Sequence, residues 1–162
     1  MKKIAMLLSV CMSLYTFSCK SPTKIDGSMA YATFETECLG VGLDGTQTLR
    51  AWGTGKNQAD ATEKAKKNAL RDVIFKGIRS GSAECNQRPL IFEVNAQEKY
   101  EYYFNAFFTD GGEYTNYVNL GNEKKTSKIK ASNKTQENWG VVVRVNRAEL
   151  RNKLVQDGII KP

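Results

Sequence analysis

The sequence of 162 residues contains no histidine. Histidine is the general base of Ser-His-Asp and Cys-His nucleophilic sites and a ligand in most zinc sites. Those classes of site are therefore excluded for this chain. The four cysteines also form no C-x-x-C pair, which excludes the common dithiol redox motif.

Long apolar segments are scarce, and the most marked one lies at the start of the sequence. Ile4–Phe17 follows Lys2 and Lys3, and it is too short for the ~20 residues of a membrane-spanning helix. A positive flank, a compact apolar run and a small residue before the processing point are typical of a secretory signal. We therefore expect residues 1–18 to be a signal peptide that is removed on export.

Ser18 directly precedes Cys19, and this arrangement resembles the lipobox of bacterial lipoproteins. In that family the cysteine is diacylated and becomes the new N-terminus. The resemblance implies lipid on Cys19, and two acyl chains give stable membrane anchoring. A strict lipobox has leucine where this chain has Thr16, and relaxed versions are familiar in Bacteroidota. The alternative is an ordinary signal peptide cleaved near Ser18.

Lys20 follows Cys19, where an aspartate would resemble an inner-membrane retention signal. We therefore expect the protein on the outer membrane. Ser21 and Pro22 stand where surface-exported lipoproteins of Bacteroidota carry acidic residues. We expect the domain to face the periplasm, and display at the cell surface is the alternative.

Cys38 and Cys85 remain when Cys11 leaves with the signal and Cys19 carries lipid. Two thiols cannot form a structural zinc centre. An exported protein meets an oxidising compartment, where these two cysteines can pair. Such a bond would close a loop of about 47 residues and stabilise the fold by roughly 4 kcal/mol. The alternative is two separate buried thiols.

Basic residues outnumber acidic ones by 24 to 17, with a cluster of lysines between Lys124 and Lys134. A basic segment can bind nucleic acid, anionic glycan or lipid headgroups. Lysines that alternate with polar residues are more typical of a solvated strand face, which is the interpretation we favour. We expect no nucleic-acid partner.

Period-two alternation in 31–38 and 46–52 predicts two strands, joined by a hairpin at Asp44-Gly45. Asn57 is placed to cap a helix, which carries an alanine stripe to about Ser80 and ends at Gly81. The remaining expected elements are a strand at 90–94, a helix from Asn95 to about 110, extended segments at 114–120 and 126–135, a strand at 141–145, and a helix from Asn146 to about 156.

This order of elements is ββα-βα-βββα. It predicts an α+β fold with an antiparallel or mixed sheet and helices packed mainly on one face. We expect residues 19–30 to be the lipidated cysteine with its tether, and 31–162 to be a single domain.

Two glycine motifs resemble phosphate-binding loops. Gly40–Gly45 matches G-x-G-x-x-G, but a strand pattern follows it instead of a helix, so a glycine-rich hairpin is the better interpretation. Gly53-Thr54-Gly55 does precede a helix, whose N-terminus can hold an anion. Close packing of helix backbone on the glycines is the interpretation we favour.

Acidic and aromatic residues supply the candidates for ligand binding. Glu35, Glu37, Glu98 and Glu101 are carboxylates available for glycoside hydrolysis, and two acids at i, i+2 on a strand, such as Glu35 and Glu37, point the same way at a separation near that of glycosidases. Such pairs are common on solvent faces, which is the interpretation we favour. The helix after Asn95 carries aromatic side chains at helical spacing, for which we favour core packing. The alternative is a contact surface for a ligand or partner, formed by Tyr100, Tyr102, Tyr103 and Phe107.

The segment from Ala51 to Leu70 joins a strand ending in G-x-G to a helix with alanines every four residues. It is similar to small bacterial envelope lipoproteins of the Lpp-twenty type and to the N-terminal domain of the flagellar outer-membrane protein T, over about thirty residues. The resemblance implies an α+β, non-enzymatic scaffold that meets other envelope proteins, without cofactor or metal. The alternative is a binder of a small ligand or glycan, with hydrolytic activity as a further option.

Overall fold

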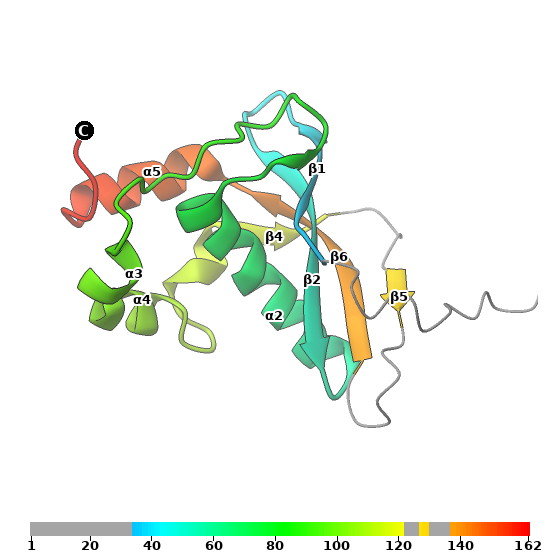
Figure 1. Cartoon of the computed structure of the whole chain (residues 1–162). Helices are drawn as coiled ribbons and strands as arrows, with labels where there is room; N and C mark the ends of the chain where they lie inside the picture. Colours follow the sequence, from blue (N-terminus) through cyan, green and yellow to red (C-terminus); the bar gives the residue numbers. More distant parts are fainter. Residues whose placement is uncertain (1–33, 122–126, 130–136) are drawn as a thin grey trace, which may run out of the picture. The chain divides into compact units, whose positions relative to one another are not determined.

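The computed structural model describes residues 34–121, 127–129 and 137–162 (Figure 1). The signal segment, Cys19, the tether and most of the lysine cluster lie outside these residues. The described strands are β1(Glu37–Val41), β2(Gln47–Gly55), β3(Ser80–Gly81), β4(Val118–Leu120), β5(Ser127–Ile129) and β6(Glu137–Val145). The helical segments are α2(Gln58–Arg71), the π-helix η2(Asp72–Lys76), α3(Ala96–Lys99), α4(Glu101–Phe107), the 3-10 helix η3(Glu113–Asn116) and α5(Arg147–Gln156).

The six strands form one mixed sheet in the order β3-β1-β2-β6-β4, with β5 also paired to β6. The β1–β3 pair is parallel and the others are antiparallel. Helix α2 packs on β2 and β6, and Figure 1 shows α2, α3, α4 and α5 on the same side of these two strands. The predicted α+β class, with helices mainly on one face, is confirmed.

Strands β4 and β5 lie along the same edge of β6 and run in the same direction. Leu120 lies opposite Val143, and Ser127 lies opposite Gly140. After β4, Gly121 donates to the carbonyl of Val142 at 2.9 Å. The two short strands therefore pair with successive parts of the same edge of β6. The first residues of the segment 114–120, which was predicted to be extended, belong instead to the 3-10 helix η3.

The core lies between β2, β6 and α2. Along β2, the side chains of Gln47, Leu49 and Ala51 are buried, whereas those between them are half-buried. Ala61, Ala65 and Ala69 face the strands from α2 and are fully buried. The predicted alternation in the strand and the alanine stripe in the helix therefore meet in one interface, and this apolar contact is what holds the helix to the sheet.

Gly53 and Gly55 allow α2 to approach β2 at backbone distance. A Cβ atom at Gly53 would lie 1.9 Å from the carbonyl oxygen of Ala61, and one at Gly55 would lie 2.5 Å from the nitrogen of Ala61. Any larger residue would collide with helix backbone. The glycines therefore serve close packing, which is the interpretation favoured from the sequence.

The segment Gly40–Gly45 forms the predicted hairpin between β1 and β2. Gly42 donates to the carbonyl of Thr46 at 2.8 Å, and Gly45 has a φ of 77°, a left-handed conformation that favours glycine. The Asp44 carboxylate accepts from the backbone N–H of Thr46 at 3.0 Å and from its hydroxyl at 2.7 Å. These contacts lower the pKa of Asp44. No helix follows, so this motif does not form a dinucleotide-binding loop.

The first helix is shorter than predicted. It passes into η2 and ends at Gly77, which has a φ of 80°, and not at Gly81. A Cβ at Gly77 would lie 2.1 Å from the carbonyl oxygen of Gln87, so only glycine fits this crossing. Gly81 belongs instead to β3, the strand that pairs with β1.

The strand predicted at 90–94 is not present. The N–H groups of Leu90 and Ile91 donate to the carbonyls of Val73 and Ile74, at 3.0 and 2.9 Å. A helix end leaves its last carbonyls without helical partners, and here this segment supplies the donors. Its backbone is therefore bound to a helix end and joins no strand of the described sheet.

The predicted helix caps have mixed outcomes. Asn57 accepts from the N–H of Asp60 at 2.9 Å, and Asn146 accepts from the N–H of Glu149 at 3.2 Å. Both caps are confirmed. Asn95 makes no capping bond, and the helix predicted after it is divided at Tyr100 into α3 and α4.

Candidate functional site

The aromatic side chains of α4 lie mostly in the core. Phe104, Phe107 and Phe108 are buried, and Phe107 is only 2% exposed. Phe107 therefore offers no contact surface, contrary to its place among the candidates. Tyr102 is 90% exposed, while Tyr100 and Tyr103 are half-buried. Of the four candidates, only Tyr102 is freely accessible.

Two of the ring pairs pack edge to face, and one of them joins α4 to η2. Phe75 from η2 meets Phe104 with ring centroids 4.7 Å apart, and Phe107 meets Phe108 at 5.0 Å. Pairs of this geometry stabilise a fold by about 0.5–1.5 kcal/mol each beyond their buried area. These contacts hold α4 in a fixed position against η2.

Tyr103 is held by the C-terminal part of the chain. Its hydroxyl donates to the carboxylate of Asp157 at 2.6 Å, and Lys153 bridges Asp157 and Glu113 at 3.2 and 3.1 Å. Burial and then the Asp157 carboxylate raise the pKa of Tyr103 well above its ordinary value. The phenol therefore stays protonated and acts as a hydrogen-bond donor, so it is no candidate for a nucleophile or general base.

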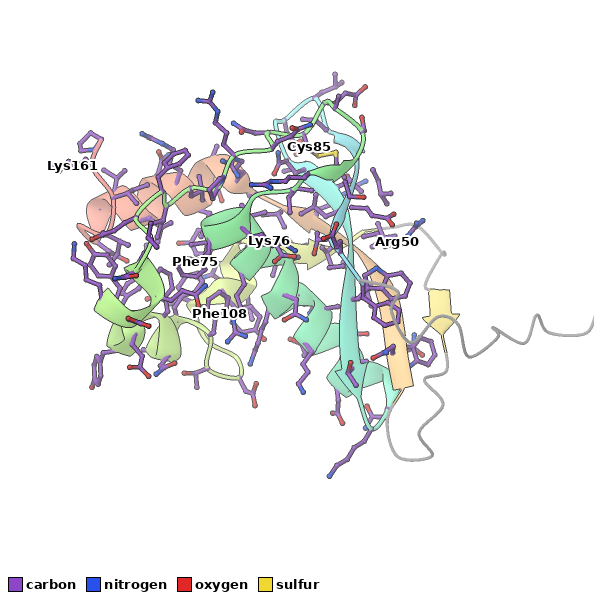
Figure 2. All side chains as sticks on the ribbon, viewed as in Figure 1. Arg50, Phe75, Lys76, Cys85, Phe108 and Lys161 are labelled. Atoms are coloured by element: carbon purple, nitrogen blue, oxygen red, sulfur yellow. A yellow bond between two sulfur atoms is a disulfide. The ribbon has the colours of Figure 1, made fainter. Side chains whose placement is uncertain are left out.

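A cavity of about 400 Å³ lies where α2 and η2 meet the aromatic helix, and we call it the aromatic cavity. Phe75, Phe104 and Phe108 supply its apolar wall, and Figure 2 shows Phe75 and Phe108 between α2 and the α3–α4 pair. Arg71 lies over the Phe108 ring at 5.2 Å, a cation–π contact. The polar side chains around it are Arg71, Gln97, Glu98, Glu101 and Asn105.

The lining of the aromatic cavity combines an apolar wall with polar side chains. The polar side chains offer planar groups with donors and acceptors, which match the hydroxyls of a sugar or the head of a small polar ligand. The sequence identified Glu98 and Glu101 as candidates, whereas it did not identify Arg71 or Phe75. Arg71 and Phe75 are four residues apart and so lie on one helix face. This spacing is the sequence feature that could have identified them.

The carboxylates Glu35 and Glu37 do not line this cavity. Glu37 pairs with Arg50 at 3.1 Å and Glu35 with Lys76 at 3.8 Å. Figure 2 places Arg50 on the side of β2 away from α2. Each of these acids faces its own cation, so the structure does not present them as a catalytic pair.

Cys38 and Cys85 form a disulfide, with their Cα atoms 6.0 Å apart (Figure 2). Both residues are buried. The bond joins β1 to the loop between β3 and α3, so it ties the segment at 90–94 to the sheet. Of the two alternatives for these cysteines, the structure has the bonded one.

Asp72 is a titratable group that sequence reasoning did not identify. It accepts a hydrogen bond from the hydroxyl of Thr36 at 2.5 Å, at the start of η2. Burial raises the pKa of Asp72 despite this bond. A π-helix often marks a functional position, but Asp72 does not line the aromatic cavity, and we treat it as a structural group.

Within the part of the chain that the structure describes, no cluster of three or more acidic, cysteine or histidine side chains could hold a metal ion. The described helices also include none with the length and apolarity needed to cross a bilayer. Comparison of the chain with protein-family models, with curated proteins and with solved structures gave no match.

Proposed function

We propose that this protein is a lipid-anchored, non-enzymatic component of a bacterial cell envelope, with a binding or scaffolding role. The observation that carries the proposal is Cys19, placed after a positive flank, an apolar run and Ser18. The disulfide between Cys38 and Cys85 supports export, because such bonds persist in oxidising compartments. The similarity of the segment 51–70 to envelope scaffold proteins supports the role.

The test is the Cys19→Ser variant of the full chain, expressed in a bacterium that processes lipoproteins. We expect it to lose incorporation of radiolabelled palmitate and to move from the membrane to the soluble fraction, because a single residue carries the anchor. Cys11→Ser is the matched control, since it makes the same change inside the expected signal. Unchanged labelling and membrane association of Cys19→Ser would refute lipid anchoring.

Two further measurements address location and partners. Protease added to intact cells should leave the protein uncut if it faces the periplasm, and cutting would place it on the surface. Gentle crosslinking followed by purification should yield a specific envelope protein. Repeated recovery of the protein alone would contradict a scaffolding role.

A second candidate function is the binding of a small polar ligand or glycan, and the aromatic cavity favours it. Glu98 and Glu101 lie beside aromatic rings there, as a sugar site requires. Titration with N-acetylglucosamine oligomers should then produce binding that Glu101→Gln weakens and Tyr102→Ala does not. The release of reducing ends would show hydrolysis. Absence of saturable binding would remove this candidate for that ligand class.

A further inference from the structure

Residues 90–94 form a strap that leaves apolar side chains in solvent. Leu90 and Ile91 are buried and bonded to the end of η2, as described above. Beyond them, Phe92 is 70% exposed and Val94 is 95% exposed. A single exposed apolar residue is ordinary on a protein surface, but an exposed aromatic ring beside open cavities indicates a place where something binds.

The first of these cavities has a volume of about 340 Å³ and lies between the start of the strap and the first turns of α5. We call it the arginine cavity, because Arg88, Arg147 and Arg151 line it. Its remaining lining residues carry no charge: Gly45, Asn86, Pro89, Leu90, Phe92 and Ala148. Three arginines thus line one small space, and no acidic residue lines it.

Arg147 connects α5 to the segment before the strap and forms none of the ion pairs found in the described residues. Its Nη2 donates to the carbonyl oxygen of Arg88 at 2.7 Å, whereas its Nη1 is buried and has no hydrogen-bond partner in the protein. Burial lowers the pKa of Arg147, and no neighbouring acid opposes this effect. A guanidinium keeps its proton in proteins nonetheless. Arg147 is half-buried, and an anion in the cavity would offset the cost of partly burying its charge.

Neither of the other two arginines is neutralised within the described part of the chain. The ion pairs found there involve Arg50 and several lysines, and none includes Arg88 or Arg151. The arginine cavity is therefore a concentration of uncompensated positive charge, with planar donors that match the oxygens of a phosphate group.

A second cavity of about 710 Å³ lies next to the first, and we call it the apolar groove. Leu90, Phe92 and Arg151 line both. The apolar side chains that line the groove are Leu90, Ile91, Phe92, Tyr100, Val155, Ile159, Ile160 and Pro162. Glu93 also lines it, but its carboxylate is paired with Lys99 at 2.9 Å.

We propose that the arginine cavity and the apolar groove together form a binding site for an anionic phospholipid. The phosphate group lies among the guanidinium groups of Arg88, Arg147 and Arg151. The acyl chain lies along the groove, where it covers the exposed ring of Phe92. The three cations select the phosphate, and the apolar lining next to them selects a lipid over free phosphate.

This inference is independent of Cys19 and of the aromatic cavity. It also holds whether the protein is lipid-anchored or released, so failure of one proposal does not decide the other.

The test measures binding to the full chain, purified in an uncharged detergent, with two probes. Dihexanoyl phosphatidic acid carries both phosphate and acyl chains, and inorganic phosphate carries no chain. We expect saturable binding of the lipid, at least about tenfold tighter than that of phosphate, because the chains bury apolar surface. The detergent background is the same for every variant, so differences between variants report the site.

Arg151→Gln removes one exposed guanidinium of the cavity and should weaken both probes about tenfold. Its matched control is Arg79→Gln, which makes the same change at an exposed residue outside both cavities. Phe92→Ser should weaken the lipid but leave phosphate unchanged, and Tyr102→Ser is its control. Melting temperatures close to that of the parent protein will verify that these four exposed changes leave the fold intact.

Several results would overturn the proposal. Equal affinity for phosphate and lipid, with no effect of Phe92→Ser, would mean that the site binds free anions and not lipid. An equal loss for Arg79→Gln and Arg151→Gln would mean that overall charge attracts the probes without a defined site. Binding of neither probe would remove the site altogether.

Discussion

Replacement of Gly53 by alanine tests how closely α2 approaches the sheet. An alanine Cβ would lie 1.9 Å from the carbonyl oxygen of Ala61 and 2.5 Å from the nitrogen of Ala65. Ordinary contact begins at 3.4 Å, so the helix must retreat by about 1.5 Å over this strand. That movement would loosen the packing of the whole alanine stripe.

Whether Gly53→Ala raises or lowers the free energy of unfolding shows whether α2 lies this close to β2. Alanine in place of glycine within a strand normally stabilises a protein by about 0.5–1 kcal/mol, through the entropy of the unfolded chain. Overpacking against side chains costs about 1–3 kcal/mol. Here the obstacle is helix backbone, which cannot rotate away, so we expect Gly53→Ala to lower the free energy of unfolding by about 3 kcal/mol.

The assay is urea denaturation of the full chain, followed by circular dichroism at a helix wavelength. Gly140→Ala is the matched control on the facing strand, because its Cβ would meet the Trp52 ring at 2.9 Å and a side chain can shift. We expect that control to lose no more than about 1 kcal/mol. If Gly53→Ala is as stable as the parent protein, the close approach of α2 is wrong.

Two further predictions concern the disulfide and Asp72. Replacement of both Cys38 and Cys85 by alanine opens a loop of 47 residues and should cost about 4 kcal/mol in urea denaturation; a loss below about 1 kcal/mol would contradict the chain-entropy argument. Since the pKa of Asp72 is raised in the fold, its contribution to stability is full below the ordinary value of 3.8 and is lost as the pH rises through the folded value. Asp72→Asn keeps an acceptor for Thr36 but cannot ionise. The melting temperature of this variant minus that of the parent protein should therefore increase from about pH 3 to about pH 7. A difference that stays constant with pH would count against this prediction.

The elements that the sequence predicted well are those that local chemistry determines. The β1–β2 hairpin follows from a glycine turn between two alternating segments, and the start of α2 follows from the Asn57 cap. The packing of α2 on β2 was also predictable, because the alanine stripe of α2 and Gly53 of β2 are complementary in shape. Each of these signals lies within about twenty residues of chain.

The errors arose where distant segments decide the outcome. The helix was expected to end at Gly81, but Gly77 ends it because the chain near Gln87 crosses there at backbone distance. Similarly, Phe107 follows the same helical spacing as Tyr103, and only the position of the neighbouring elements determines which ring is covered. Periodicity gives the face of a helix, but not the depth of each residue on it.

The misassigned segment at 90–94 is also the one that lines the proposed lipid site, and the two facts share a cause. A short apolar run is consistent with a buried strand, but it cannot distinguish a strand from an extended strap. The free carbonyls of Val73 and Ile74 take the N–H groups of the strap, and this turns Phe92 towards solvent.

The arginine cavity could not be inferred from sequence for a related reason. Arg88 and Arg147 are 59 residues apart, and they meet because α5 starts where β6 ends, beside the strap. In the sequence, Arg147 and Arg151 resemble ordinary solvated helix residues, as the excess of basic residues would suggest. Only their convergence on a space without carboxylates distinguishes them, and that convergence is a property of the topology. A site formed by single residues from separate elements therefore becomes visible only in the folded chain.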